Sequence, residues 1–354
     1  MSFALPEDQE ELRRVVRRFF EEKSSPAAVR STMESEEPFD PKLWEQMAGE
    51  LGLPALHIPE SHGGQGFSFV ELAVVFEEAG RALVTSPLFS SVGLAANAIL
   101  AAGSDEQQAR FLPGIASGEV LATAAFGDPK APVTVDGSAL SGTVRFVVDG
   151  MTAKLLIVPA GDALYAVEAE AAGVQRQPMT ALDLTRPQAT VTLSGVAAER
   201  LGDGDPATAR RAVDYGLVCL AAEMAGGARR CLEASVEYAR ERIAFGVPIG
   251  SFQGIKHQLA ELYMKVEQAA SVAYHAAGAA AGDDPELPLV ASIAKAYCSD
   301  AYTEMATENI QIHGGIGFTW EHDAHLYFRR ARASEVMLGD ATFHRERIAA
   351  WFLD

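Results

Sequence analysis

The chain has 354 residues, of which 48% are hydrophobic and 22% charged, a length that suffices for two or three domains. Its formal net charge of -19 argues against a nucleic-acid-binding protein, since such surfaces neutralise phosphates with lysine and arginine. The three cysteines have no paired spacing and no histidine cluster nearby, so neither a disulfide framework nor a metal site is predicted. No apolar run reaches the roughly 18 residues of a membrane span and no signal sequence is evident, so we expect a cytoplasmic protein without a membrane partner.

The first third of the chain has the apolar spacing of helices. This spacing covers residues 6–23, 40–51, 69–83, 91–102 and 105–116. In the second of these segments Asp40 can cap the amino terminus and Pro41 suits the first turn. We therefore predict a helical domain over residues 1–118.

The middle of the chain changes to short runs of valine, threonine and alanine, punctuated by glycine, proline and aspartate. Such runs predict a small antiparallel sheet or barrel over residues 119–203. After Pro206 the helical period returns in long alanine-rich segments that favour close packing, so a bundle-like helical domain is predicted over 204–354. The predicted fold class is therefore α+β multidomain: helical, then β, then helical.

Two segments of the last domain carry groups suited to a dinucleotide. One contains Arg242, Phe245 and Gln253, and the other contains Gln311 followed by Gly314 and Gly315. A diphosphate needs a fixed cation and a backbone that lets amides come close, while an adenine needs amide donors and acceptors. Two structural alternatives remain: Arg242 can cap the carboxyl end of a helix, and the glycine pair can be only a turn.

The first segment resembles the Arg-x-x-Phe-Gly and Phe-Gln signature of the flavin-dependent acyl-CoA dehydrogenases, and 311–318 resembles their second, glycine-rich signature. Residues 53–66 and 77–81 extend the resemblance over nearly the whole chain. It implies that family's three-domain fold, FAD as cofactor and an acyl-CoA thioester as substrate. It also implies that Arg242, Phe245 and Gln253 contact a FAD held mainly by another subunit, so that the protein is an oligomer, with the 311–315 turn near the adenosine half.

The sequence departs from this family where the catalytic base is expected. Most members carry a glutamate near the carboxyl end, and an ungapped count from Gln311 puts Leu338 at that position. Other members carry it on the long helix before the arginine signature, where the count gives Gly216. A positioned base is needed because the proton beside a thioester is only weakly acidic.

Asp340 and Asp214 each lie two residues from one of these positions and are the weak candidates for the catalytic residue. A two-residue offset turns a helical side chain by about 200° and moves an extended one by about 6.6 Å. Because catalysis is sensitive to misplacement of about 1 Å, neither is a ready replacement, and both can be solvated or helix-capping acids.

Three functions remain open. The first is a subunit of a heteromeric acyl-CoA dehydrogenase in which a homologous partner supplies the glutamate, as in paired actinobacterial enzymes that act on bulky steroid side-chain thioesters. The second is a self-sufficient homo-oligomeric dehydrogenase with Asp340 as a displaced base. The third is a non-redox protein that binds thioesters or acts as a scaffold. The sequence favours the first, because the segments that reach a neighbour's flavin are retained while the base is missing.

Overall fold

The computed structural model describes residues 5–128 and 132–353. Its helices are α1 (Glu7–Lys23), α2 (Pro26–Met33), α3 (Pro41–Gly49), α4 (Phe69–Arg81), the π-helix η3 (Phe89–Ala96), α5 (Asn97–Ala102), α6 (Asp105–Ala116), α7 (Pro206–Glu241), α8 (Gln253–Ala281), α9 (Leu287–His313), α10 (Ala324–Val336) and α11 (Ala341–Leu353), with short 3-10 turns that include η4 (Ile249–Ser251) and η5 (Gly314–Phe318). Its strands are β1 (Ala122–Ala124), β2 (Thr134–Asp136), β3 (Ala139–Val148), β4 (Leu155–Ala160), β5 (Ala163–Glu168), β6 (Val174–Met179), β7 (Gln188–Ala197), β8 (Glu199–Arg200), β9 (Ile243–Ala244) and β10 (Val247–Pro248).

Contacts divide the chain into two compact units. One comprises Met1–Val29, Ala73–Val84 and Leu217–Asp354, and the other comprises Arg30–Leu72 and Thr85–Gly216. The division falls inside α4 and inside α7, so each of these helices contributes to both units.

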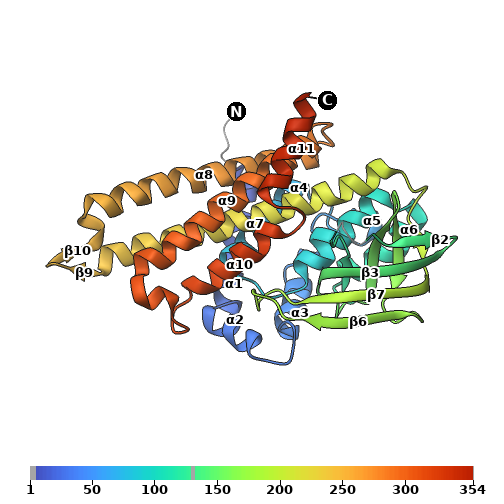
Figure 1. Ribbon diagram of the computed structural model, residues 1–354, viewed down its shortest axis with the longest axis horizontal. Helices are drawn as coiled ribbons and strands as arrows, with labels where there is room; N and C mark the ends of the chain where they lie inside the picture. Colours follow the sequence, from blue (N-terminus) through green and yellow to red (C-terminus); the bar gives the residue numbers. More distant parts are fainter. Residues whose placement is uncertain (1–4, 129–131, 354) are drawn as a thin grey trace. The chain divides into compact units, whose positions relative to one another are not determined.

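The first unit is built on the long helices, and α8 packs against α9 through a face rich in alanine (Figure 1). Within this unit α4 and α7 touch backbone to backbone. A Cβ at Gly80 would lie 2.0 Å from the carbonyl oxygen of Glu223, and one at Gly226 would lie 1.8 Å from that of Glu77. Only glycine allows this close crossing of the two helices.

Two neighbouring acids interrupt the apolar pattern of α4, and α1 neutralises them. Arg17 donates two hydrogen bonds to the carboxylate of Glu78, at 2.9 and 2.7 Å. Arg13 donates to Glu77 at 3.2 Å. Burial raises the pKa of Glu78, and the Arg17 contacts oppose that rise. The ion pairs thus explain why carboxylates are tolerated on the buried face of a core helix.

The second unit contains two four-stranded sheets, with orders β1-β4-β5-β8 and β2-β3-β7-β6 (Figure 1). All pairs are antiparallel except β1 with β4, which is parallel. The predicted strand region is therefore present, with one parallel pair that the pattern did not indicate. Buried apolar residues of both sheets form one hydrophobic core, among them Leu140 of β3, Leu156 of β4 and Val191 of β7.

Some helices differ from the sequence prediction. The segment predicted as an α-helix from Ser91 begins as the π-helix η3, whose residues are all buried. Ser91 fixes it to β1, because its hydroxyl donates to the carbonyl of Ala122 at 3.1 Å and accepts from its amide at 3.0 Å.

The predicted cap of α3 is confirmed, since the Asp40 side chain accepts from the amide of Lys42 at 2.9 Å. Within the described residues, no helix has the length and apolar character of a membrane span.

Candidate functional site

The hairpin after α7 presents an aromatic side chain to solvent. Ala244 of β9 pairs with Val247 of β10, which leaves Phe245 and Gly246 as a two-residue loop with φ angles of 54° and 83°. Two positive angles are typical of a type I′ turn, which asparagine and glycine prefer. The left-handed conformation costs a bulky residue about 1–2 kcal/mol, and the Phe245 side chain is 97% exposed. Its ring meets that of Phe252 edge-on, with centroids 6.2 Å apart, but so exposed a side chain gains little burial to offset this cost.

Arg242 stands between α7 and this hairpin, with a fixed backbone and an exposed side chain. Its amide donates to the carbonyl of Tyr238 at 2.8 Å, and its carbonyl accepts from the amide of Ile249 at 2.8 Å. The guanidinium forms no ion pair with any residue that the structure describes. Gln253, the first residue of α8, is also exposed. Arg242, the predicted cation for a diphosphate, and the amide of Gln253 thus both face solvent.

The second predicted segment ends α9. Gln311 is exposed, and Gly314 has φ 65° and ψ -144°, a combination that only glycine adopts readily. A Cβ built at Gly314 or Gly315 would meet no atom within 4 Å, so the space above this turn is open. An open glycine pair is suited to a ligand that contacts the backbone closely.

A ring stack joins the two segments. Tyr238, four residues before Arg242, lies against His313, with ring centroids 4.3 Å apart. The Nδ1 of His313 lies 2.8 Å from the carbonyl oxygen of Asn309, which makes this nitrogen the donor and fixes the ring. Burial lowers the pKa of His313, so its ring is neutral at neutral pH. The structure therefore brings the ends of α7 and α9 together, beside the hairpin at one end of the long helices (Figure 1).

Sequence reasoning missed Tyr238 and His313 as members of this site. The spacing of four residues between Tyr238 and Arg242 puts both on one helix face, which is the signal that could have indicated the tyrosine. His313 lies directly before the glycine pair within the second motif. Its partner across the bundle could not be read from the sequence.

The two positions predicted for the missing base lie in different local settings. Leu338 is half-buried in the turn between α10 and α11 and has a left-handed φ of 57°. Gly216 is a buried residue inside α7. Neither position carries a titratable side chain.

The two candidate acids are engaged elsewhere. Asp340 is exposed and its Oδ1 accepts from the amide of Phe343 at 2.8 Å, which is the pattern of an amino-terminal cap on α11. Asp214, on α7, is 1% exposed and is not free of interactions. The geometry favours structural roles for both carboxylates.

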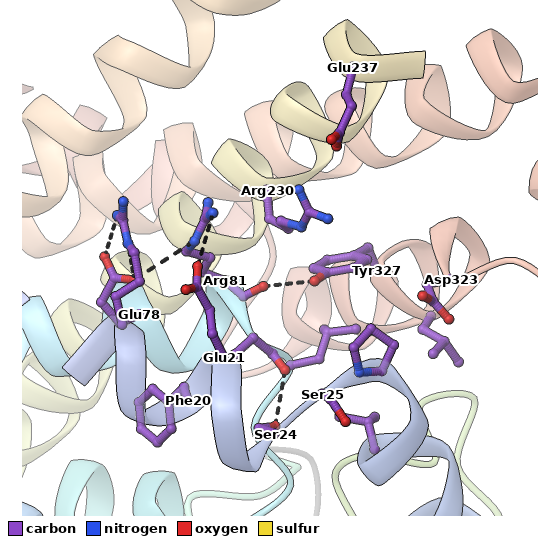
Figure 2. A pocket seen from close by; sticks show the side chains of 16 residues that line it. Phe20, Glu21, Ser24, Ser25, Glu78, Arg81, Arg230, Glu237, Asp323 and Tyr327 are labelled. Atoms are coloured by element: carbon purple, nitrogen blue, oxygen red, sulfur yellow. Dashed lines mark hydrogen bonds and ion pairs between the residues drawn. The ribbon is translucent and has the colours of Figure 1, made fainter. Parts of the chain in front are cut away.

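A separate cavity of about 300 Å³ lies in the first unit, among α1, α4, α7 and α10 (Figure 2). Each of its arginines forms an ion pair: Arg17 with Glu78, and both Arg81 and Arg230 with Glu233. The hydroxyl of Tyr327 donates to the carbonyl of Arg81 at 2.7 Å. None of the predicted cofactor residues lines this cavity, so it is a polar junction between helices rather than the predicted site.

The exposed groups at the end of the bundle fit a dinucleotide. The cation of Arg242 suits a diphosphate, the amides of Gln253 and Gln311 suit an adenine or ribose, and the open glycine pair accepts a close ligand. Within the described residues, no cluster of histidine, cysteine and carboxylate side chains could hold a metal ion.

Two models of one protein family match most of this chain. The family model "Acyl-CoA dehydrogenase, N-terminal domain" matches residues 6–119, and "Acyl-CoA dehydrogenase, C-terminal domain" matches 205–353. Acyl-CoA dehydrogenase IpdE2 of Mycolicibacterium smegmatis is 37% identical over 346 residues, which cover 98% of this chain and 99% of the relative.

Solved structures extend the comparison to the fold. The ChsE4-ChsE5 complex from Mycobacterium tuberculosis contains a chain that is 28% identical, with a TM-score of 0.93 and coverage of 100% of this chain and 99% of its own. A variant of the Tcur3481-Tcur3483 steroid ACAD is 30% identical, with a TM-score of 0.91 and coverage of 98% of both chains. These matches confirm the predicted fold, with an N-terminal helical, a middle β and a C-terminal helical domain.

Proposed function

Because this chain belongs to the acyl-CoA dehydrogenase family of oxidoreductases, we propose that it is the subunit without a catalytic base in a heteromeric acyl-CoA dehydrogenase. In this reaction a carboxylate takes the proton from the carbon next to the thioester carbonyl. The adjacent carbon loses a hydride, and a double bond forms between the two carbons. In the proposed assembly a homologous partner supplies the carboxylate.

The single observation that carries the proposal is the residue in the turn between α10 and α11. Leu338 occupies the position of the family's glutamate by the ungapped count, and an aliphatic side chain cannot accept a proton. The alternative position holds Gly216, which has no side chain at all. The proton acceptor must then come from another residue of this chain or from another chain.

The acids nearest to these positions give little support to a self-sufficient enzyme. A general base must lie within reach of the proton that it removes, and its acceptor atom must be available to take that proton. One carboxylate oxygen of Asp340 accepts from the amide of Phe343, and Asp214 is buried and is not free of interactions. Asp340 remains the first residue to test for the alternative.

The family is FAD-dependent, and the residues present fit this cofactor. We propose that Arg242, Phe245 and Gln253 contact a FAD held mainly by a neighbouring subunit, while Gln311, Gly314 and Gly315 lie at its adenosine half. The exposure of the Arg242 and Phe245 side chains supports this. The Arg242 guanidinium forms no ion pair with any described residue, and the Phe245 ring stays 97% exposed although it meets the edge of Phe252. When bound, FAD accepts the hydride; the residues of this chain bind and orient it.

The relatives support a heteromer and a bulky substrate. One structural relative is a complex of two different proteins, ChsE4 and ChsE5, and another is named the Tcur3481-Tcur3483 steroid ACAD. We propose that this chain likewise pairs with a homologous subunit and that the complex acts on a steroid or similarly bulky acyl-CoA.

The test is expression of the chain alone and together with a homologous subunit that carries the glutamate. Flavin absorbance per polypeptide and reduction of a dye by a steroid side-chain CoA thioester would be measured for both preparations. We expect substoichiometric flavin and no turnover for the chain alone, and full values for the pair. Full flavin loading with turnover by the chain alone would refute the proposal. A bound, substrate-reducible flavin in either preparation would exclude the scaffold alternative.

A further inference from the structure

A lysine is buried beneath the turn that contains Leu338. Lys295 of α9 is 0% exposed, and its Nζ donates to Ser299 Oγ and to the carbonyl oxygens of Glu335 and Gly339, each at 2.9 Å. Three acceptors match the three protons of an ammonium. Removing an ammonium group from water costs free energy even when its donors are satisfied, and lysine is rarely fully buried. The burial of Lys295 therefore indicates a role beyond packing.

The two carbonyls lie on either side of one short turn. Glu335 belongs to the last turn of α10, where carbonyls lack partners within the helix and a cation is favoured by the helix dipole. Gly339 lies three residues beyond the end of α10. A single ammonium therefore fixes both ends of the segment that contains Met337 and Leu338.

A histidine holds the carbonyl between these two contacts. His344 Nε2 lies 3.0 Å from the carbonyl oxygen of Leu338, so this nitrogen must carry the proton. Burial, with a smaller effect of Lys295, lowers the pKa of His344 to about 4, which keeps the ring neutral in the physiological range. Phe343 and His344 also leave no room for a side chain at Gly339, where a Cβ would come within 2.4 Å of the phenyl ring.

We propose that Lys295 is a positioning residue that clamps the 337–340 turn and holds residue 338 in its left-handed conformation. The clamp uses only main-chain oxygens of the turn, so its geometry does not depend on which side chain stands at position 338. The turn thus keeps its shape although this chain carries leucine where its family carries a base. The importance of the turn for catalysis rests on the proposed function, whereas the clamp does not.

The clamp is tested by hydrogen exchange of backbone amides in the folded chain. Lys295→Met removes all three donors. Because hydrogen bonds from a charged group stabilise the closed turn, we expect the amides of residues 337–340 to exchange about tenfold faster, or more, in this variant. Lys265→Met is the matched control, because Lys265 is on the surface of α8 and binds Glu304. No change in the turn, or an equal change throughout α7 and α9, would contradict the clamp. If Lys295→Met does not fold, Lys295→Gln is judged by the same comparison.

A double substitution distinguishes positioning from general support of the fold. Leu338→Gly removes the strain of a left-handed leucine only while the turn is clamped. We therefore expect its effect on the melting temperature to differ between the natural chain and Lys295→Met, in which residue 338 can relax. Equal effects in the two backgrounds, including no effect in either, would overturn the proposal. Neither measurement needs substrate or a partner, so the result is independent of the proposed function.

Discussion

The phenol ring of Tyr238 and the imidazole of His313 stack 4.3 Å apart and tie the end of α7 to the end of α9. Arg242 follows the tyrosine by four residues, and Gly314 follows the histidine directly. The stack therefore sets the separation of the cation and the open glycine turn that we propose to bind FAD.

Removal of the stack should weaken cofactor binding by the assembled protein. Tyr238→Ala removes an aromatic pair worth about 1 kcal/mol, which corresponds to roughly a fivefold loss of FAD affinity if the separation of the two segments is relaxed. Tyr238→Phe retains the ring and should retain the affinity. Titration of the flavin-free assembly with FAD measures both, and equal affinities for the alanine and phenylalanine variants would argue against this role of the ring.

Two substitutions of Asp340 separate capping from catalysis. Asparagine can accept the same amide hydrogen bond but cannot act as a base, whereas alanine can do neither. We expect Asp340→Asn to preserve stability and Asp340→Ala to lose about 1 kcal/mol, with turnover of the assembled enzyme unchanged in both. Chemical denaturation and dye reduction check the two properties. Loss of turnover in the asparagine variant would favour a base on this chain.

Phe245 should affect assembly and stability in opposite directions. Asparagine suits a left-handed turn position better than phenylalanine, so Phe245→Asn should stabilise the isolated chain by up to about 1 kcal/mol. The same substitution should weaken association with the partner, since the exposed ring is removed. Denaturation of the chain and sedimentation of the mixture measure the two effects. Phe67→Ala, an exposed aromatic of the other unit, is the control.

The buried amine of Lys295 should make stability depend on alkaline pH. Burial lowers its pKa from 10.5 to about 8, with Cys298 and Glu335 among the groups that oppose the shift. Between these values the unfolded chain holds a proton that the folded chain has released, so the unfolding free energy contributed by this group rises with pH, by at most about 1.4 kcal/mol per unit. Urea denaturation from pH 7.5 to 10 should show this rise relative to Lys295→Met. Parallel pH profiles for the two proteins would contradict it.

The sequence predicted those features that depend on local pattern. Asp40 and Pro41 marked the start of α3, and the apolar period located the long helices, because both signals lie within a few neighbouring residues. The acids on α4 looked like an interruption, since their partners on α1 are 61 and 64 residues away. Tertiary pairing of this kind leaves no local trace.

The site was predictable as a set of groups but not as a geometry. The motifs indicated Arg242 and Gly314, whereas the Tyr238 and His313 stack that joins them depends on how α7 and α9 pack. The left-handed Phe245 and Leu338 were unpredictable as well, because leucine and phenylalanine rarely adopt this conformation and hairpin or clamp contacts impose it. The π-helix η3 likewise follows from contacts with β1 rather than from its own residues.

We propose that the proton acceptor belongs to the partner, and hydrogen exchange at the carbon next to the thioester carbonyl distinguishes this from a base on this chain. A steroid side-chain CoA thioester is incubated in D2O with the assembled protein, and deuterium uptake at that carbon is followed. We predict that Glu→Gln in the partner abolishes uptake, while Asp340→Asn in this chain leaves it unchanged. Uptake that survives the partner's substitution and is lost with Asp340→Asn would instead place the base on this chain.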